Sequence, residues 1–230
     1  MAQAGLHAAI GCQTKRFIPH EKRLFPALMF GTMLPDLDII IVAFSSIIYT
    51  IKQAETIFHR TFSHSFFSLI FIYLTFLILA EIKKDPTLKS IGKGIAFGML
   101  IHYIVDTFLW FRHIHLLWPL PLDPVNLWKA WEFPPFIHKI LLALEFFFFR
   151  WYAWFLITQH LKHPGEKSWY IKYLNQWKSI ESILFLSIAI MVIGNLPFFE
   201  VLFGLFYIPS LIMALVSTYI SRDALEYQPK

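Results

Sequence analysis

Five long apolar segments constrain this sequence more than any other feature. A helix that crosses a bilayer needs roughly 20 mostly apolar residues, with about 17 as the lower limit. Only 15% of the 230 residues are charged, whereas a soluble domain usually has about 25% charged residues. We therefore expect an all-α, polytopic integral membrane protein, a helical bundle with about five transmembrane helices. The expected spans are 62–81, 92–111, 137–158, 180–198 and 203–220.

Two shorter apolar pieces, 24–34 and 39–51, precede these spans. Each is too short to cross a bilayer. They flank Pro35, and a proline disfavours helix in the residue before it. We expect them to be partial-depth or interfacial helices at the N-terminal end of the bundle.

The chain offers no clear domain boundary. No stretch is long enough, polar enough or rich enough in Gly and Ser to be a linker. We therefore expect residues 1–230 to form a single integral membrane domain, with a motif-bearing part at 5–119 and a C-terminal helical part at 137–220.

The positive charges are divided unevenly between the two sides of the membrane. Threading the spans places fourteen Lys and Arg residues on one side, in segments 13–23, 82–93 and 159–179 and in the C-terminal tail, and four on the other. By the positive-inside rule the richer side is cytoplasmic, so we expect a cytoplasmic C-terminus and an outer loop at 112–136. Because these charges serve orientation in the lipid bilayer, the net charge of +5 does not indicate nucleic acid as a partner.

Ionisable residues at membrane depth are costly and usually mark functional sites. His102 and Asp106 stand four residues apart in span 92–111, so they lie on one helix face and can share a ligand. The alternative is a His–Asp hydrogen bond that ties two helices together.

Two more histidines, His59 and His64, stand near the start of span 62–81. On a continuous helix, side chains five residues apart would point about 140° away from each other. Thr61 or Ser63 can cap the helix N-terminus, which would leave His59 before the helix and let both histidines face one site. The alternative is a solvated pair of interfacial histidines.

Two carboxylates, Asp36 and Asp38, lie in a strongly apolar stretch. In an extended conformation alternate residues face the same way, so both acids can point at one place. Buried carboxylates without cations would be costly or protonated, and a bound divalent ion removes that cost. The alternative is that both are surface turn residues.

Together these segments supply six imidazole and carboxylate groups on one side of the membrane. Cys12 is the sole cysteine, so we expect neither an intrachain disulfide nor a cysteine-based zinc cluster. Nitrogen and oxygen ligands without thiolate fit Zn²⁺, Mn²⁺ or Fe²⁺, and the number of histidines favours zinc. The expected cofactor is therefore a divalent metal ion, with Zn first and Mn or Fe as alternatives.

Five short motifs follow one another along the first half of the chain: Gly5-x-His7, Leu34-Pro35-Asp36-Leu37-Asp38, His59-Arg60-x-Phe62-Ser63-His64-Ser65, His102-x3-Asp106 and Leu117-Trp118-Pro119. Their order resembles that of the YdjM-like family, inner-membrane proteins described as metal-dependent hydrolases. The similarity covers roughly residues 5–119. It implies a site in the inner membrane whose metal-binding residues are His7, Asp36, Asp38, His59, His64, His102 and Asp106.

Two positions depart from the family pattern. Thr61 stands where the family usually has Gly after the Arg of the histidine motif. The stretch 107–115 lacks the Gly that the family tends to have before the Trp-Pro pair. The ligand series is also similar to that of zinc-dependent phospholipase C, and this similarity implies phosphoester hydrolysis.

The resemblance implies a membrane-bound metal-dependent hydrolase that acts on a phosphoester or lipid-linked substrate through a metal-activated water. Asp38 is the expected general base or the carboxylate that orients a histidine. Arg60 is expected to bind a phosphate, with an ion pair to Asp36 or Asp38 as the alternative. The competing hypothesis is a membrane protein that binds or transports metal without hydrolytic activity.

Overall fold

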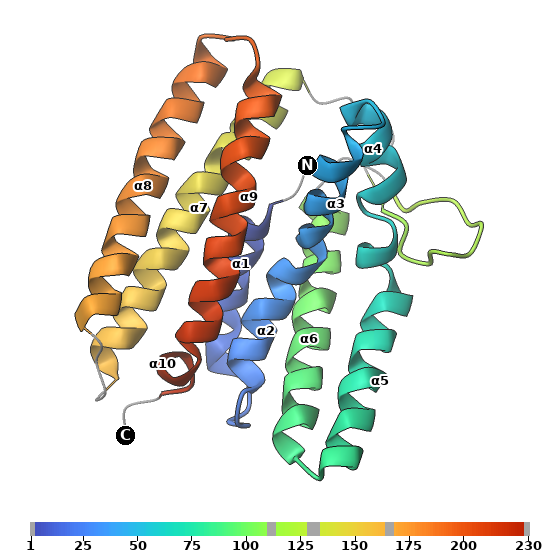
Figure 1. Ribbon diagram of the computed structural model, residues 1–230, viewed down its shortest axis with the longest axis vertical. Coiled ribbons are helices and arrows are strands. Elements are labelled where there is room, and N and C mark those ends of the chain that lie inside the picture. The colour runs from blue at the N-terminus through green and yellow to red at the C-terminus, as the bar shows by residue number, and fades with distance from the viewer. Residues whose placement is uncertain (1–2, 110–113, 128–133, 164–167, 228–230) are drawn as a thin grey trace. The chain divides into compact units, whose positions relative to one another are not determined.

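A computed structural model describes residues 3–109, 114–127, 134–163 and 168–227. Within these ranges the regular structure is helical, apart from one isolated antiparallel bridge between Ile114 and Val125. The chain forms two compact units (Figure 1). The first contains Pro19–Phe133, and the second contains Gln3–Ile18 with Pro134–Lys230.

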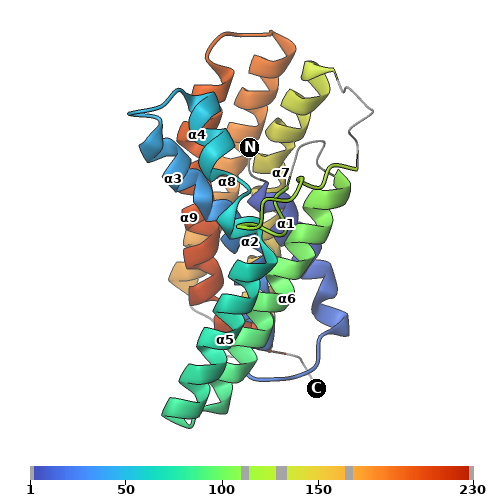
Figure 2. The ribbon, with the colours of Figure 1, turned by 90° about the vertical axis from the view of Figure 1, so that its right-hand side faces the viewer.

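The first unit is built around three neighbouring helices, α2, α5 and α6, which lie side by side in Figures 1 and 2. Short helices join α2 to α5. In chain order the elements are α2 (Leu24–Met33), the 3-10 helix η2 (Leu34–Leu37), α3 (Asp38–Ser45), α4 (Ile51–Phe58), the 3-10 helix η3 (Phe62–His64), α5 (Phe66–Lys83) and α6 (Pro86–Leu109).

The expected separation of 24–34 from 39–51 is wrong. The helical run continues from Leu24 to Ser45 over 22 residues, long and apolar enough to cross a membrane. Pro35 does not break it, because Pro35 occupies the first turn of η2, where no N–H is needed and the fixed φ of proline suits a helix. The described residues thus hold six candidate membrane spans, five of which overlap the spans expected from sequence.

Glycines allow α2 and α6 to approach each other closely. A Cβ added at Gly98 of α6 would lie 2.2 Å from the carbonyl oxygen of Leu28, and one added at Gly31 of α2 would lie 2.3 Å from that of Ile95. Small residues at such contacts let membrane helices pack backbone against backbone. This packing brings the last turn of α2 against the middle of α6, where His102 lies.

The second unit contains three long helices, α7 (Pro135–Lys162), α8 (Ser168–Ile193) and α9 (Phe199–Ile220), which pack against one another. Three shorter elements complete it, namely α1 (Ala4–Gln13), the 3-10 helix η1 (Thr14–Phe17) and α10 (Arg222–Glu226). Its buried aromatic core includes Phe146, Phe149, Tyr152, Tyr170 and Tyr207.

Helix α1 is held by its N-terminus against α7. The buried carboxylate of Glu145 accepts hydrogen bonds from the backbone N–H groups of Gly5 and Leu6. These are amides of the first helical turn, which have no partner within the helix. This anchor fixes α1, and with it His7, within the second unit.

Candidate metal centre

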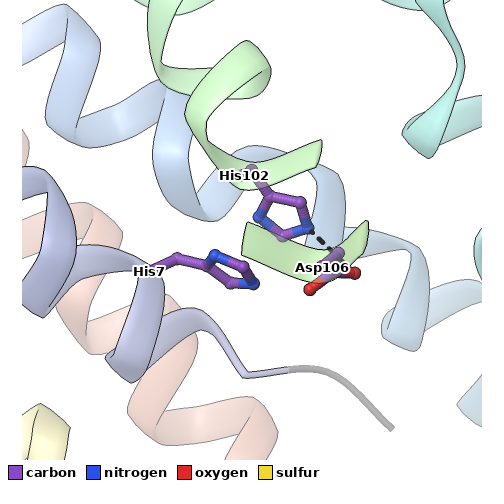
Figure 3. A group of neighbouring side chains, drawn as sticks. All are labelled: His7, His102 and Asp106. Carbon is purple, nitrogen blue, oxygen red and sulfur yellow. Dashed lines mark ion pairs between the residues drawn. The ribbon is translucent and has the colours of Figure 1, made fainter. Parts of the chain in front are cut away.

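Four buried side chains from three elements of the first unit meet at one point. Asp36 comes from η2, His64 from η3, and His102 and Asp106 from α6. Each is at most 1% exposed. Figure 3 shows His102 and Asp106 one turn apart on α6, with a dashed line marking their ion pair. The expectation that these two share one helix face is confirmed.

The two histidines face each other through their Nε2 atoms, which lie 3.0 Å apart. Oδ1 of Asp36 lies 3.8 Å from Nε2 of His64 and 3.9 Å from Nε2 of His102. Oδ2 of Asp106 lies 3.6 Å and 3.7 Å from the same two nitrogens. Two imidazole nitrogens and two carboxylate oxygens therefore converge.

This donor set fits a zinc-sized ion. Tetrahedral zinc has Zn–N and Zn–O distances of about 2.0–2.2 Å, so its ligand atoms lie about 3.3–3.6 Å apart. The separation of the two histidine nitrogens and the four nitrogen–carboxylate separations lie close to that range, from 3.0 to 3.9 Å. Asp36, His64 and His102 form one group whose ligand atoms all lie within 4.8 Å of one another.

The far sides of both rings are occupied by protein acceptors. Nδ1 of His102 lies 2.8 Å from the carbonyl oxygen of Thr32 and must donate to it. Nδ1 of His64 lies 2.8 Å from Oγ of Ser63, which donates to Asp38. A neutral imidazole that donates through Nδ1 has its lone pair on Nε2. These bonds therefore leave the lone pair of each ring on the Nε2 atom that faces the cluster, which is the arrangement that histidine ligands of metals show.

Asp38 does not face the same place as Asp36. One oxygen of Asp38 accepts a hydrogen bond from Nδ1 of His59 at 2.7 Å. The other accepts from the backbone N–H of Arg60 at 3.0 Å and from the hydroxyl of Ser63 at 2.6 Å. The extended conformation expected for this segment is wrong, because residues 34–37 form a 3-10 helix and Asp38 begins α3.

His59 lies before the helix that carries the span, as the spacing required. It follows α4 in an extended conformation, while α5 begins only at Phe66. The helix cap is Ser65, whose hydroxyl accepts from the N–H of Ser68, so the expected caps Thr61 and Ser63 are wrong. Burial lowers the pKa of His59 to about 4, although the nearby Asp38 carboxylate opposes this shift. His59 is therefore neutral near pH 7.

Nε2 of His59 is buried and makes no hydrogen bond to the described residues. The His59 ring nevertheless lies beside His64, with ring centroids 5.6 Å apart. His59 thus presents a free ring nitrogen close to the converging group without being one of its four members.

Arg60 pairs with a different carboxylate from those expected. Its Nη2 lies 3.5 Å from Oδ2 of Asp106, and the guanidinium is buried. Arg60 also contacts Asp38, through its backbone N–H. The backbone of Arg60 has a φ of 61°, in the left-handed region that few residues other than glycine adopt. This turn directs the main-chain N–H and the side chain to separate carboxylates.

His7 is buried on α1, in the second unit. Its membership of the metal site remains a prediction from the family motif. Three residues of the first unit that contact the histidines were not predicted from the sequence, namely Thr32, Ser63 and Tyr103. Of these three residues, Thr32 alone carries a signal in the sequence, because its polar side chain interrupts an apolar segment.

The family model described as YdjM inner membrane protein matches residues 2–213. The match therefore extends well past the 5–119 region that carries the motifs and into the C-terminal helices. No curated protein and no solved structure matches the chain significantly.

Proposed function

Because the chain belongs to the YdjM inner membrane protein family, we propose that it is a membrane hydrolase with a divalent metal ion, zinc first, at the buried His–Asp cluster. Its membership and its six apolar helical runs make it a multi-pass protein of the inner membrane. The hydrolytic activity and the metal are the parts that we infer.

The observation that carries the proposal is the approach of two Nε2 lone pairs to 3.0 Å beside two carboxylates, all fully buried. Lone pairs and carboxylates brought together in an apolar interior are costly, and Arg60 supplies one positive charge beside Asp106. A divalent cation between them would offset that cost by coordination. His64, His102, Asp36 and Asp106 are the residues that would hold it.

The surrounding residues would have separate roles. A divalent ion bound here would supply Lewis-acid activation of water at neutral pH. Asp38 would orient His59 and His64 by accepting their hydrogen bonds, directly and through Ser63, rather than bind the metal itself. His59, neutral and with a free Nε2, would add a further ligand. Arg60 would neutralise Asp106 and bind a substrate phosphate.

Helix α4 supports a substrate that comes from the membrane. Ile51 and Ile57 of α4 are about half exposed, while Lys52 and Glu55 lie on the same short helix. A helix with exposed apolar side chains and charges suits the lipid–water interface. Because α4 ends directly before His59, a lipid or lipid-linked phosphoester would reach the site along this surface.

The test is hydrolysis in a bilayer. Purified protein in liposomes is offered phospholipids and other phosphoesters, with and without a chelator, and released product is measured. We expect cleavage that the chelator abolishes and added Zn²⁺ restores. If no phosphoester is cleaved while the protein carries metal ions across the same membranes, the proposal of hydrolysis is wrong and transport replaces it.

A further inference from the structure

Tyr103 directly follows His102 on α6 and is 1% exposed. Its hydroxyl lies 3.0 Å from the carbonyl oxygens of both Ser63 and Ser65. It also lies 3.2 Å from the hydroxyl of Ser68. Tyr103 thus links the helix that carries His102 to the residues on both sides of His64.

The segment around His64 needs such a partner. The chain leaves the one-turn helix η3 at His64 and begins α5 at Phe66, so the carbonyl of Ser63 belongs to η3 and is not part of the hydrogen-bond ladder of α5. A buried carbonyl without a hydrogen-bond donor is costly, so this group needs a partner. Among the described residues, the hydroxyls of Tyr103 and Ser68 are the donors within reach of it.

The Tyr103 ring also contacts both histidines. It stacks beside His64, with ring centroids 6.3 Å apart and an interplanar angle of 29°. It meets His102 edge to face at 6.2 Å. The hydroxyl and the ring therefore restrain the same two imidazoles whose Nε2 atoms lie 3.0 Å apart.

We propose that Tyr103 is a positioning residue for the metal centre: its hydroxyl fixes the His64 segment against α6 and so sets the separation of the two histidine ligands. This inference rests on the proposed metal site. Removal of the hydroxyl leaves the Tyr103 ring in the apolar cluster with Ala27, Ile95 and Met99, so the helices stay packed. The His64 segment, however, loses its tie to His102.

The test substitutes Tyr103→Phe and follows Co²⁺ and Zn²⁺ binding in purified protein. Co²⁺ reports coordination geometry through its visible absorption, and competition with Zn²⁺ gives affinity. Tyr152→Phe is the matched control, because Tyr152 is equally buried and its hydroxyl bonds Thr218 in the second unit. We expect Tyr103→Phe to bind about 10-fold more weakly, as loss of a supporting hydrogen bond typically does, with an altered Co²⁺ spectrum. Tyr152→Phe should match the wild type.

A Tyr103→Phe protein with wild-type affinity and spectrum would overturn the inference while leaving the metal centre in place. Equal losses in Tyr103→Phe and Tyr152→Phe would also overturn it, because they would reflect general destabilisation. A wild-type protein that binds no Co²⁺ would instead refute the metal centre itself. Should Tyr103→Phe not fold, Ser68→Ala removes a partner hydroxyl of the same network and is expected to shift the spectrum in the same direction.

Discussion

The carboxylate of Asp38 is bound on both oxygens by groups of the 59–64 segment. It accepts from the ring of His59, the N–H of Arg60 and the hydroxyl of Ser63. Asp36, two residues earlier, faces the Nε2 atoms of two histidines instead. The two acids therefore make different contacts, because Asp38 holds the 59–64 segment and Asp36 faces the two histidine rings.

We expect Asp38→Asn to weaken metal binding without abolishing it. The amide keeps the shape of the side chain but loses the charge and one acceptor, so the rings of His59 and His64 are less well oriented. Loss of such an outer partner typically lowers metal affinity by about 10–100-fold. Competition titration measures the change, with the exposed Asp123→Asn as control. An unchanged affinity would show that Asp38 does not act through the histidines.

At the residue scale, the sequence drew attention to the ionisable groups that converge but did not predict their contacts. Asp36, His64, His102 and Asp106 were predictable because ionisable groups are conspicuous in apolar segments. Tyr103 was not, because one tyrosine among many acquires its role only through the fold. The expectation that Asp36 and Asp38 point at one place was wrong. It assumed an extended backbone, whereas Pro35 lies in the first turn of a 3-10 helix.

At the scale of elements, the contact between α2 and α6 decides whether the site forms. It places the carbonyl of Thr32 at 2.8 Å from Nδ1 of His102. The 3-10 helix η2, which carries Asp36, follows α2 directly in the chain. The backbones can come this close because Gly31, Gly94 and Gly98 have no side chain at the contact.

We expect Gly98→Ala to destabilise the protein, because the new Cβ would lie 2.2 Å from the carbonyl oxygen of Leu28. Overpacking of this kind typically costs about 1–3 kcal/mol. Gly204→Ala in α9 is the matched control, since its Cβ would have nothing within 4 Å. It should be neutral or stabilise by up to about 1 kcal/mol through helix propensity. Thermal unfolding in detergent compares the two, and equal melting temperatures would contradict the close contact.

Hydropathy located the elements but not their ends. Helix α8 begins at Ser168, twelve residues before the expected span 180–198, because a helix continues beyond its apolar part where polar side chains such as Lys172 are exposed. The run from Leu24 to Ser45 was divided at Pro35 because sequence alone does not show whether a proline ends a helix or begins a turn of one.

At the scale of the whole chain, the sixth candidate span changes the orientation argument. With only the five expected crossings, segment 13–23 would lie opposite loop 82–93, so the expected division of fourteen basic residues against four did not follow from those five spans. With Leu24–Ser45 as an additional crossing, both lie on one side, and the division of fourteen basic residues against four holds. The cytoplasmic C-terminus, which follows from the positive-inside rule, thus depends on this span.

We expect cysteines introduced at Lys89 and Asp123 to label from opposite sides. Both positions are exposed, and a Cys12→Ala background removes the sole natural thiol. An impermeant maleimide should modify Asp123→Cys in intact cells and Lys89→Cys only after lysis. The reverse pattern would invert the orientation, and labelling of both from outside would contradict the number of crossings.

The most direct test of the central claim is the metal content of the purified protein. We expect at least one equivalent of divalent metal, zinc first, per wild-type chain, measured by elemental analysis. The His64→Ala/His102→Ala variant lacks both Nε2 donors and should lose that metal while remaining helical by circular dichroism. It should also lose the thermal stabilisation that added Zn²⁺ gives the wild type, since a ligand of the native state stabilises it by mass action. Full metal occupancy in the double variant would contradict the account.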